Sequence, residues 1–318
     1  MATSYIHFTE EQKERANSID LEYFLQSKGE QLIRSGRDRR LKSDHSITIR
    51  GNTWYDHAKE KGGYAIDFVK MFYGLDFPSA VTELIGETGN NLSHRTYEKK
   101  EEAPKPFILP PRCATMKRAF AYLTKHRGID PQVASFFAKE KLVYESEEIS
   151  KDRTQKYNNL IFVGLDENGV PAHAHKRSIY SQGKKFMQNI EGSNPHHSFH
   201  YLGGSNRLYV FEAPIDMLSF ITMYKDTNWK THNYVAMCGT SSMPMTELLD
   251  RHDTIDHVVV CTDNDKTGHA VYERFKEMLS ERGVASSRIT PQTKDFNEDL
   301  LSQQANSEPT LTMEMRCV

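Results

Sequence analysis

Short apolar segments alternate with amphipathic ones in the last third of the chain. Apolar runs occupy 207–212, 233–239 and 257–263, and each precedes a segment whose apolar residues recur at helical spacing. The runs have the length of strands, and each recurring segment has the length of a helix. Strands that alternate with helices form parallel sheets covered on both faces. The pattern therefore predicts an α/β fold built on a parallel sheet.

The rest of the chain has a mixed pattern. In the N-terminal part we predict a short amphipathic helix, two strands and a pair of helices, over 19–29, 45–50, 52–57 and 62–86. In the middle part we predict two helices and a hairpin that turns at Glu167–Gly169, over 116–128, 130–142 and 159–179. Both parts are expected to be small α+β regions.

A charged and proline-rich segment separates the first two regions. Residues 94–112 carry four of the twelve prolines, which resist both helix and strand. A softer break, rich in Gly, Ser, Asn and His, covers 191–206. We therefore predict an N-terminal domain over 1–97, a linker over 98–112, an α+β basic subdomain over 113–206, the parallel-sheet domain over 207–305 and a C-terminal tail over 306–318.

Acidic residues follow two of the predicted parallel strands. Glu212 ends the first strand, and Asp263 and Asp265 follow the third. The carboxyl ends of parallel strands meet at one edge of the sheet, where ligands bind. A cluster of hard oxygen ligands suits Mg²⁺ or Mn²⁺ bound together with a phosphate group. Glu212 is placed to act as a general acid/base or as a metal ligand.

A simpler interpretation of these acids is helix capping. An acid that follows a strand often caps the next helix, and Asp216 or Asp263 could do only that. An isolated Asp-x-Asp leaves the two interpretations about even, because a motif match is only a hypothesis. The joint presence of Glu212 favours the metal site.

Composition limits the classes of partner. Net charge is −2, so a nucleic-acid partner requires local basic patches. The four cysteines are far apart in the sequence, which indicates reduced thiols in a cytoplasmic protein. No apolar run is long enough to span a membrane, so no membrane partner is expected.

One basic cluster and one histidine cluster stand out. The segment 28–42 contains Arg34, Arg37, Arg39 and Arg40, which suit contacts with a phosphate backbone, although a solvated loop would have the same composition. Trp54, Tyr55 and Tyr64 follow nearby and suit base stacking. His196, His197 and His200 are expected to be solvent-exposed residues of a loop.

The last third of the chain resembles the Toprim domain of bacterial primases, topoisomerases and some nucleases. The resemblance is carried by "YVFEAPIDMLSF" and "VVVCTDNDKTGHAVYERF". It implies a Rossmann-like parallel sheet in which Glu212, Asp263 and Asp265 are catalytic and bind Mg²⁺ or Mn²⁺, with Asp216 in support. "KDFNEDLL" resembles the K-D-W-N-D-x-L tail of one Toprim subgroup, which implies that Lys294 and Asp295 lie near the acids.

The resemblance extends upstream. "WYDHAKEKGGYAIDFVKMFYGLDFPSAVTEL" resembles the end of the zinc-binding domain of bacterial primases. This chain has no cysteine before Cys113, and His45 and His57 cannot complete a tetrahedral site, so we expect the domain shape without zinc. The middle hairpin and "LYVFEAPIDMLS" together resemble proteins of conjugative and other mobile elements. In primases the region before Toprim is basic and binds template, which implies a role in nucleic-acid binding for Lys176, Arg177, Lys184 and Lys185.

These resemblances imply a primase-like protein of a mobile element. The expected activity is metal-dependent nucleotidyl transfer with single-stranded DNA and nucleotides, and a helicase or relaxase is a possible partner. Two alternatives stay open. A Toprim nuclease would use the same carboxylates with water as nucleophile. A DNA-binding accessory protein would keep the fold, and its acidic cluster would have no catalytic role.

Overall fold

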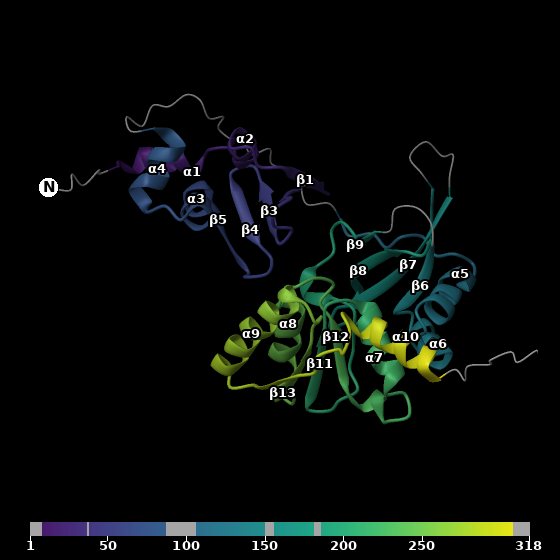
Figure 1. Ribbon diagram of the computed structural model, residues 1–318. Helices are drawn as coiled ribbons and strands as arrows, with labels where there is room; N and C mark the ends of the chain where they lie inside the picture. The colour runs from purple at the N-terminus through teal and green to yellow at the C-terminus, as the bar shows by residue number, and fades with distance from the viewer. Residues whose placement is uncertain (1–7, 37, 87–105, 150–155, 181–185, 308–318) are drawn as a thin grey trace, which may run out of the picture. The chain divides into compact units, whose positions relative to one another are not determined.

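The computed structural model of the chain describes residues 8–36, 38–86, 106–149, 156–180 and 186–307 (Figure 1). It divides into two units, residues 1–103 and 104–318, each of which is described by itself. The predicted sites at Arg37, Lys184 and Lys185 lie outside the described residues.

The first unit is an antiparallel sheet with helices packed against one face. Its strands follow one another in sheet order: β1 (Leu32–Ser35), β2 (Asp38–Leu41), β3 (Ile47–Arg50), β4 (Thr53–Asp56) and β5 (Lys61–Tyr64). Its helices are α1 (Glu10–Asn17), α2 (Leu21–Ser27), α3 (Ala65–Tyr73) and α4 (Phe77–Ile85). Phe24, Ile49, Trp54 and Phe68 lie in one core, so the helices and the inner face of the sheet bury each other.

Local sequence accounts for most of this unit. The Asp20 carboxylate caps α2 and the Asp76 carboxylate caps α4. Gly74 ends α3 with a positive φ of 65°, which glycine adopts without steric cost. The predicted α2, β3, β4, α3 and α4 are confirmed. The basic segment, for which the pattern predicts no strand, forms β1 and β2, a hairpin whose charged residues give no apolar alternation.

The second unit opens with two helical segments and an antiparallel sheet. Helix α5 (Lys117–Ala121) continues into the π-helical turn η1 (Tyr122–His126) and is followed by α6 (Pro131–Lys139). The sheet order is β6 (Val143–Ile149), β7 (Lys156–Leu165), β8 (Pro171–Ser178) and β9 (Met187–Asn189). The predicted hairpin is confirmed as β7–β8, with a turn closed by the Gly169 N–H on the Asp166 carbonyl. The two outer strands, β6 and β9, were not predicted.

The remainder of the unit is the predicted parallel sheet. Its order is β10 (His200–Tyr201), β12 (Asn233–Ala236), β11 (Arg207–Phe211), β13 (His257–Cys261) and β14 (Ala285–Arg288). All neighbouring strands are parallel except the short β10, so the α/β fold class is confirmed. The connecting helices are α7 (Pro214–Met223), α8 (Met243–Arg251), α9 (Lys266–Glu281) and α10 (Phe296–Ser307).

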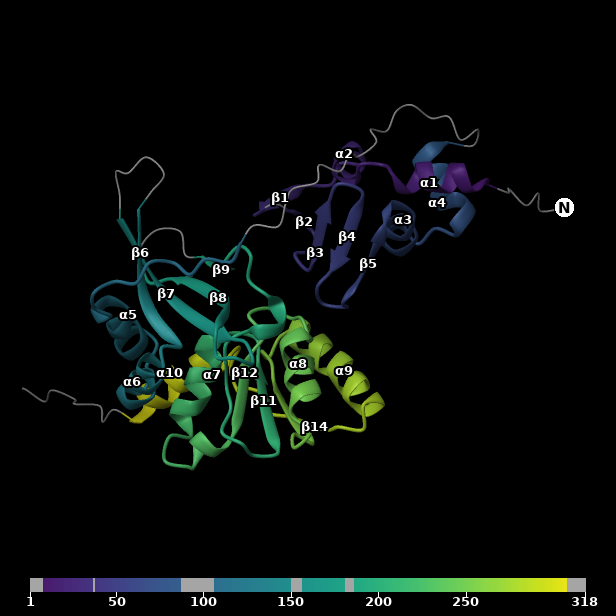
Figure 2. The same cartoon turned by 180° about the vertical axis from the view of Figure 1, so that it is seen from behind.

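The sheet is covered on both faces. Helices α7 and α10 pack on one face and α8 and α9 on the other, as Figures 1 and 2 show from opposite sides. Alternate strand residues supply the two cores: Phe211 and Val259 belong to one, and Val210 and Val258 to the other. No helix among the described residues is long and apolar enough to cross a membrane.

The antiparallel sheet and the parallel sheet share a core. Phe162 of β7 packs in the same cluster as Phe211 of β11, together with Phe137 of α6 and Phe199, which precedes β10. Strand β10 precedes the predicted boundary at residue 206, yet it pairs with β12. The middle segment and the parallel-sheet region are therefore built on one continuous core, and the finer domain boundaries stay predictions.

Candidate functional site

The acidic residues lie at the carboxyl edge of the parallel sheet. Strands β11 and β13 are neighbours with Phe211 opposite Cys261, so the residues that follow them emerge side by side. The backbone N–H of Asp263 donates a hydrogen bond to Oε1 of Glu212, at 3.1 Å. Two residues separated by 51 positions in the sequence are thereby joined directly.

Asp265 begins helix α9. Its Oδ1 accepts a hydrogen bond from the backbone N–H of Gly268 at 2.9 Å, so this carboxylate is the helix cap. The first turn of α9 packs closely against Asp263. A Cβ on Gly268 would lie 2.0 Å from the backbone carbonyl oxygen of Asp263. Only glycine fits there, and its presence brings the start of α9 against the Asp-x-Asp segment.

Asp216 lies in the first turn of α7 and is 8% exposed. The backbone N–H of Asn297, at the start of α10, donates to its Oδ1 at 3.3 Å. Asp295 precedes that helix and accepts from the N–H of Glu298 at 2.8 Å. Asp299 accepts hydrogen bonds from the segment that leads to α10 and so holds it in place beside the acids.

Burial and mutual repulsion disfavour negative charge at this edge. Desolvation, with Asp263 nearby, raises the pKa of Glu212 to about 8. Desolvation, with Asp295 and Asp265 nearby, raises the pKa of Asp263 to about 6. Burial, followed by repulsion from Asp295 and Asp263, raises the pKa of Asp216 well above its usual value. Carboxylates held in this way gain most from a bound cation.

The donors are chemically suited to a hard divalent cation. Carboxylate oxygens are the ligands that Mg²⁺ and Mn²⁺ prefer. Among the residues that the structure describes, no three His, Cys, Asp or Glu side chains lie close enough to form a complete metal-binding group. Mg²⁺ is commonly held by one or two carboxylates while it keeps several waters. Glu212 and Asp263 supply two nearby carboxyl groups of this chemistry.

Comparison with known proteins agrees with this geometry. Residues 209–300 match the family described as Toprim-like, and the match contains Glu212, Asp263 and Asp265. This part of the chain is therefore similar to a Toprim-like domain, and residues 209–300 are called the Toprim-like domain below. Residues 121–207, directly before it, match a family described as a protein of unknown function, DUF3991.

Proteins and protein fragments similar to most of this chain come from bacteria and a bacteriophage. The Bacillus anthracis protein pXO2-78, described as uncharacterized, is 28% identical over 304 residues, which cover 88% of this chain and 83% of that protein. The primase fragment of the bacteriophage T7 primase-helicase has a TM-score of 0.44 at 12% identity, covering 82% of this chain and 91% of that one. The zinc-binding and RNA polymerase domains of the Aquifex aeolicus primase have a TM-score of 0.40 at 15% identity, covering 94% and 85%.

Arg288 is a residue of the Toprim-like domain that the sequence did not single out. It ends strand β14, and its guanidinium donates to the backbone carbonyl of Asp263 at 3.2 Å. Its positive charge lowers the pKa of Glu212 and so opposes part of the effect of burial. The other residues of this edge strand are small, so the sequence gives no signal for Arg288.

A second group, in which the predicted Arg177 meets the unpredicted Tyr122, Arg127 and Asn297, joins the segment before the Toprim-like domain to the acids. The Tyr122 hydroxyl accepts hydrogen bonds from Nε of Arg127 at 2.9 Å and from Nε of Arg177 at 3.0 Å. Arg127 also donates to Oδ1 of Asn297 at 2.9 Å. Because the N–H of Asn297 donates to Asp216, two arginines are linked to the acidic edge.

The remaining predicted basic residues have mixed surroundings. Lys176 is 12% exposed at its side chain and is paired with Glu148 at 2.8 Å. In the first unit, Arg39 is paired with Glu22 and Arg40 donates to the His45 carbonyl. Arg34 is exposed on strand β1. Within the second unit, Arg177 is linked to the acidic edge through Tyr122 and Arg127, whereas Lys176 is paired with Glu148.

The prediction for the histidines was partly wrong. His197 and His200 are not free in a loop, because the first belongs to a 3-10 turn and is 9% exposed, and the second lies in strand β10. Burial lowers the pKa of His200, and its Nδ1 is 2.7 Å from the Ser198 carbonyl oxygen. His196 is half-exposed, and its Nδ1 lies 3.1 Å from a carboxylate oxygen of Glu247. The packing of the turn against β7 accounts for the burial, because a Cβ on Gly164 would clash with the His197 carbonyl.

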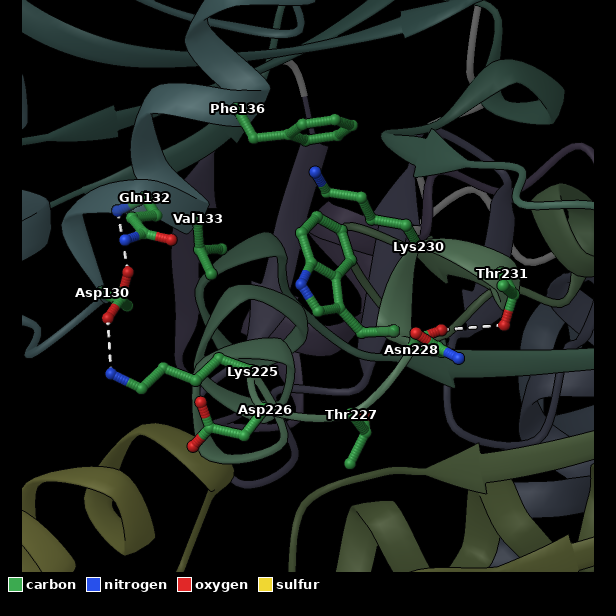
Figure 3. Close-up of a pocket in the computed structure, with 11 residues that line it drawn as sticks. Asp130, Gln132, Val133, Phe136, Lys225, Asp226, Thr227, Asn228, Lys230 and Thr231 are labelled. Carbon is green, nitrogen blue, oxygen red and sulfur yellow. Dashed lines mark hydrogen bonds and ion pairs between the residues drawn. The ribbon is translucent and has the colours of Figure 1, made fainter.

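A separate cavity of about 380 Å³ lies at the other end of α7 (Figure 3). Helix α7 starts two residues after Glu212, whereas residues 225–231, which follow its end, line this cavity. Lys230 points toward Phe136 in Figure 3, with its Nζ 4.8 Å from the ring centroid. The chain's own cation therefore covers this aromatic wall, and the cavity belongs to a different region from the acids.

Proposed function

We propose that the chain is a primase-like nucleotidyltransferase that synthesises primers on single-stranded DNA in a mobile element. The observation that carries the proposal is the Glu212–Asp263 pair at the carboxyl edge of the parallel sheet, with both pKa values raised. At the level of the family, the Toprim-like match supports phosphoryl transfer on nucleic acid. Primer synthesis and the mobile-element role are the finer parts of the proposal.

Asp263 and Asp265 would hold the Mg²⁺ or Mn²⁺ ion, with Glu212 as a further ligand or as general acid/base. Such an ion, when bound, offsets the negative charge that develops on a phosphoryl oxygen. Glu212 has a pKa near neutrality, which suits a group that accepts and releases a proton at physiological pH. Asp216, Lys294 and Asp295 would shape the edge around it.

The two arginines on Tyr122 would bind the phosphates of nucleic acid or nucleotide. Arg127 and Arg177 are held by the same hydroxyl, which fixes their guanidinium groups without neutralising them. A single guanidinium can donate to two phosphate oxygens at once, and a preorganised guanidinium loses less entropy on binding. This arrangement supports a nucleic-acid path toward the acids.

The test is a primer-synthesis assay. The protein is incubated with single-stranded DNA, labelled nucleotides and Mn²⁺ or Mg²⁺, beside Asp263→Ala and the control Asp253→Ala, an exposed acid of the loop after α8. Extension products that Asp263→Ala loses and Asp253→Ala keeps would support the proposal. Shortened DNA that is produced by the wild type and by Asp253→Ala but not by Asp263→Ala would indicate a Toprim nuclease instead. Wild-type activity in Asp263→Ala would refute the metal-site interpretation.

A non-catalytic DNA-binding accessory protein is favoured by one separate observation. The first unit exposes Tyr55 and Tyr64, and the pairing of Thr53 with Tyr64 places both tyrosines on the sheet face away from the core. Exposed aromatic rings on a sheet suit the stacking of unpaired bases. If Tyr55→Ala and Tyr64→Ala weaken binding of oligo-dT while no assay detects synthesis or cleavage, the accessory role replaces the enzymatic one.

A further inference from the structure

A groove runs between the α5–η1 segment and helix α6, away from the acids. It holds about 540 Å³ and is lined mainly by apolar surface from Met116, Phe120 and Ala138. In both views α5 and α6 lie on one flank of the second unit (Figures 1 and 2). The proposed function uses no residue of this groove.

The floor of the groove is apolar and anchored to the core. Met116 and Phe120 are half-buried, and each packs from outside against the main hydrophobic cluster of the unit. Their outer faces therefore remain open to a ligand, while their inner faces are held. Methionine adapts its shape to different partners, which is why it is common at peptide-binding surfaces.

The rim of the groove is positively charged. Lys117, Lys125 and Lys139 are exposed, and no acidic side chain is among the described residues that line the groove. Within the described part of the chain none of the three forms an ion pair. By contrast, Lys156 and Lys225 are each paired with a carboxylate at 2.8 Å. Three unpaired lysines around one groove are notable in a chain whose net charge is −2.

Helix dipoles account for only part of this arrangement. Lys125 and Lys139 lie in the last turns of their helices, where a cation is favourable. Lys117 is the first residue of α5, where the dipole disfavours a cation. The third lysine therefore calls for another reason, and a negatively charged ligand supplies one.

We propose that this groove docks an acidic amphipathic peptide segment of a partner protein. Apolar side chains of the segment would cover Met116 and Phe120, and its carboxylates would lie beside the three lysines. Nucleic acid fits less well, because phosphates would use the lysines but leave the apolar floor uncovered. A helix or strand with apolar anchors flanked by acids matches both parts of the surface.

The test uses a fluorescein-labelled synthetic peptide in which leucines and a phenylalanine are flanked by aspartates. Fluorescence anisotropy with the full chain should show saturable binding that weakens as salt is raised, because exposed charges are screened. Lys125→Glu and Lys139→Glu should each weaken binding by about two- to five-fold, the range expected for the loss of one exposed ion pair. Lys276→Glu, an exposed charge reversal on α9, should leave binding unchanged.

The apolar floor is tested separately. Phe120→Ser should weaken binding of the aspartate peptide, and circular dichroism checks that the variant is folded. A peptide whose leucines and phenylalanine are replaced by serine should not bind, and neither should one whose aspartates are replaced by lysine. Binding that survives any of these changes would overturn the proposal.

Three other results would also overturn it. The aspartate peptide could fail to bind to the wild-type chain. Oligo-dT could bind with the same dependence on Lys125 and Lys139, which would assign the groove to nucleic acid. The chain could form a dimer that Lys125→Glu dissociates, which would assign the groove to a second copy. None of these results tests Glu212 or Asp263. The proposed function is tested by the primer-synthesis assay alone, so the failure of one proposal can be told from the failure of the other.

Discussion

The backbone N–H of Asp263 donates a hydrogen bond to Oε1 of Glu212 at 3.1 Å, which ties the end of β13 to the end of β11. The bond stabilises the ionised form of Glu212, yet desolvation and the charge of Asp263 outweigh it and raise the pKa of Glu212 to about 8. The folded chain therefore holds two carboxyl groups together at an electrostatic cost. In the proposed function, a divalent cation would offset that cost.

Removal of one of these charges should stabilise the metal-free protein. With a chelator present, Asp263→Asn should raise the free energy of unfolding by about 1–3 kcal/mol at neutral pH, because the ionised carboxylate is partly buried beside other acids. Urea unfolding followed by Trp229 fluorescence in a Trp54→Phe background measures the change. Mn²⁺ should then stabilise the wild type more than Asp263→Asn, with Asp253→Asn as the control. Equal stabilisation by Mn²⁺ in all three proteins would contradict the metal site.

Gly268→Ala should disrupt the Asp-x-Asp segment. The added Cβ would lie 2.0 Å from the Asp263 carbonyl oxygen, a backbone atom that cannot move alone. We expect a loss of stability of about 1–3 kcal/mol, typical of overpacking, and a larger loss of any Mn²⁺-dependent activity. Thr267→Ala, at the exposed neighbouring position, is the matched control. The prediction is wrong if the two variants unfold at the same urea concentration.

Asn297→Ala should uncouple the arginines from the acids. The Asn297 side chain accepts from Arg127 and donates to the Arg127 carbonyl and to the Ser219 hydroxyl, and it is 3% exposed. Loss of these buried partners should cost about 1–3 kcal/mol in the free energy of unfolding. Gln304→Ala removes a hydrogen bond of an exposed α10 residue to Gly128 and should cost less. Equal costs for Asn297→Ala and Gln304→Ala would show that the network does not act as a buried unit.

His173 should make the second unit sensitive to acid. Burial, aided by His175 and His197, lowers the pKa of His173 to about 3 from 6.5, so the folded protein keeps it neutral while the unfolded chain protonates it. The stability that depends on the neutral ring is fully present above pH 6.5 and is lost progressively as the pH falls toward 3. Between pH values of about 7 and 5, the wild type should lose about 2 kcal/mol more than His173→Gln.

The same unfolding experiment provides the control for His173. His126→Gln replaces an exposed histidine of η1 and should keep the pH dependence of the wild type. If His173→Gln and His126→Gln show the same slope of stability against pH, the buried ring is not the origin of the acid sensitivity.

Local pattern determined the main elements and the place of the acids. Alternation of apolar strands with amphipathic helices specifies a parallel sheet, because a strand buried on both faces is apolar throughout and its covering helix is not. Parallel strands end at one edge, so the positions of Glu212, Asp263 and Asp265 in the sequence already place them there. The strands that the pattern missed are the ones with charged or small residues, such as β1, β2 and β14.

Tertiary packing decided the surroundings of those acids. The link from Asp216 through Asn297 to Arg127 joins residues up to 170 positions apart, and no local preference encodes such a contact. The same is true of the burial of His173 and His200, which depends on what packs over their strands. Sequence spacing sets which residues share a strand or a helix face, whereas pKa values and long-range hydrogen bonds follow from the elements that desolvate those residues.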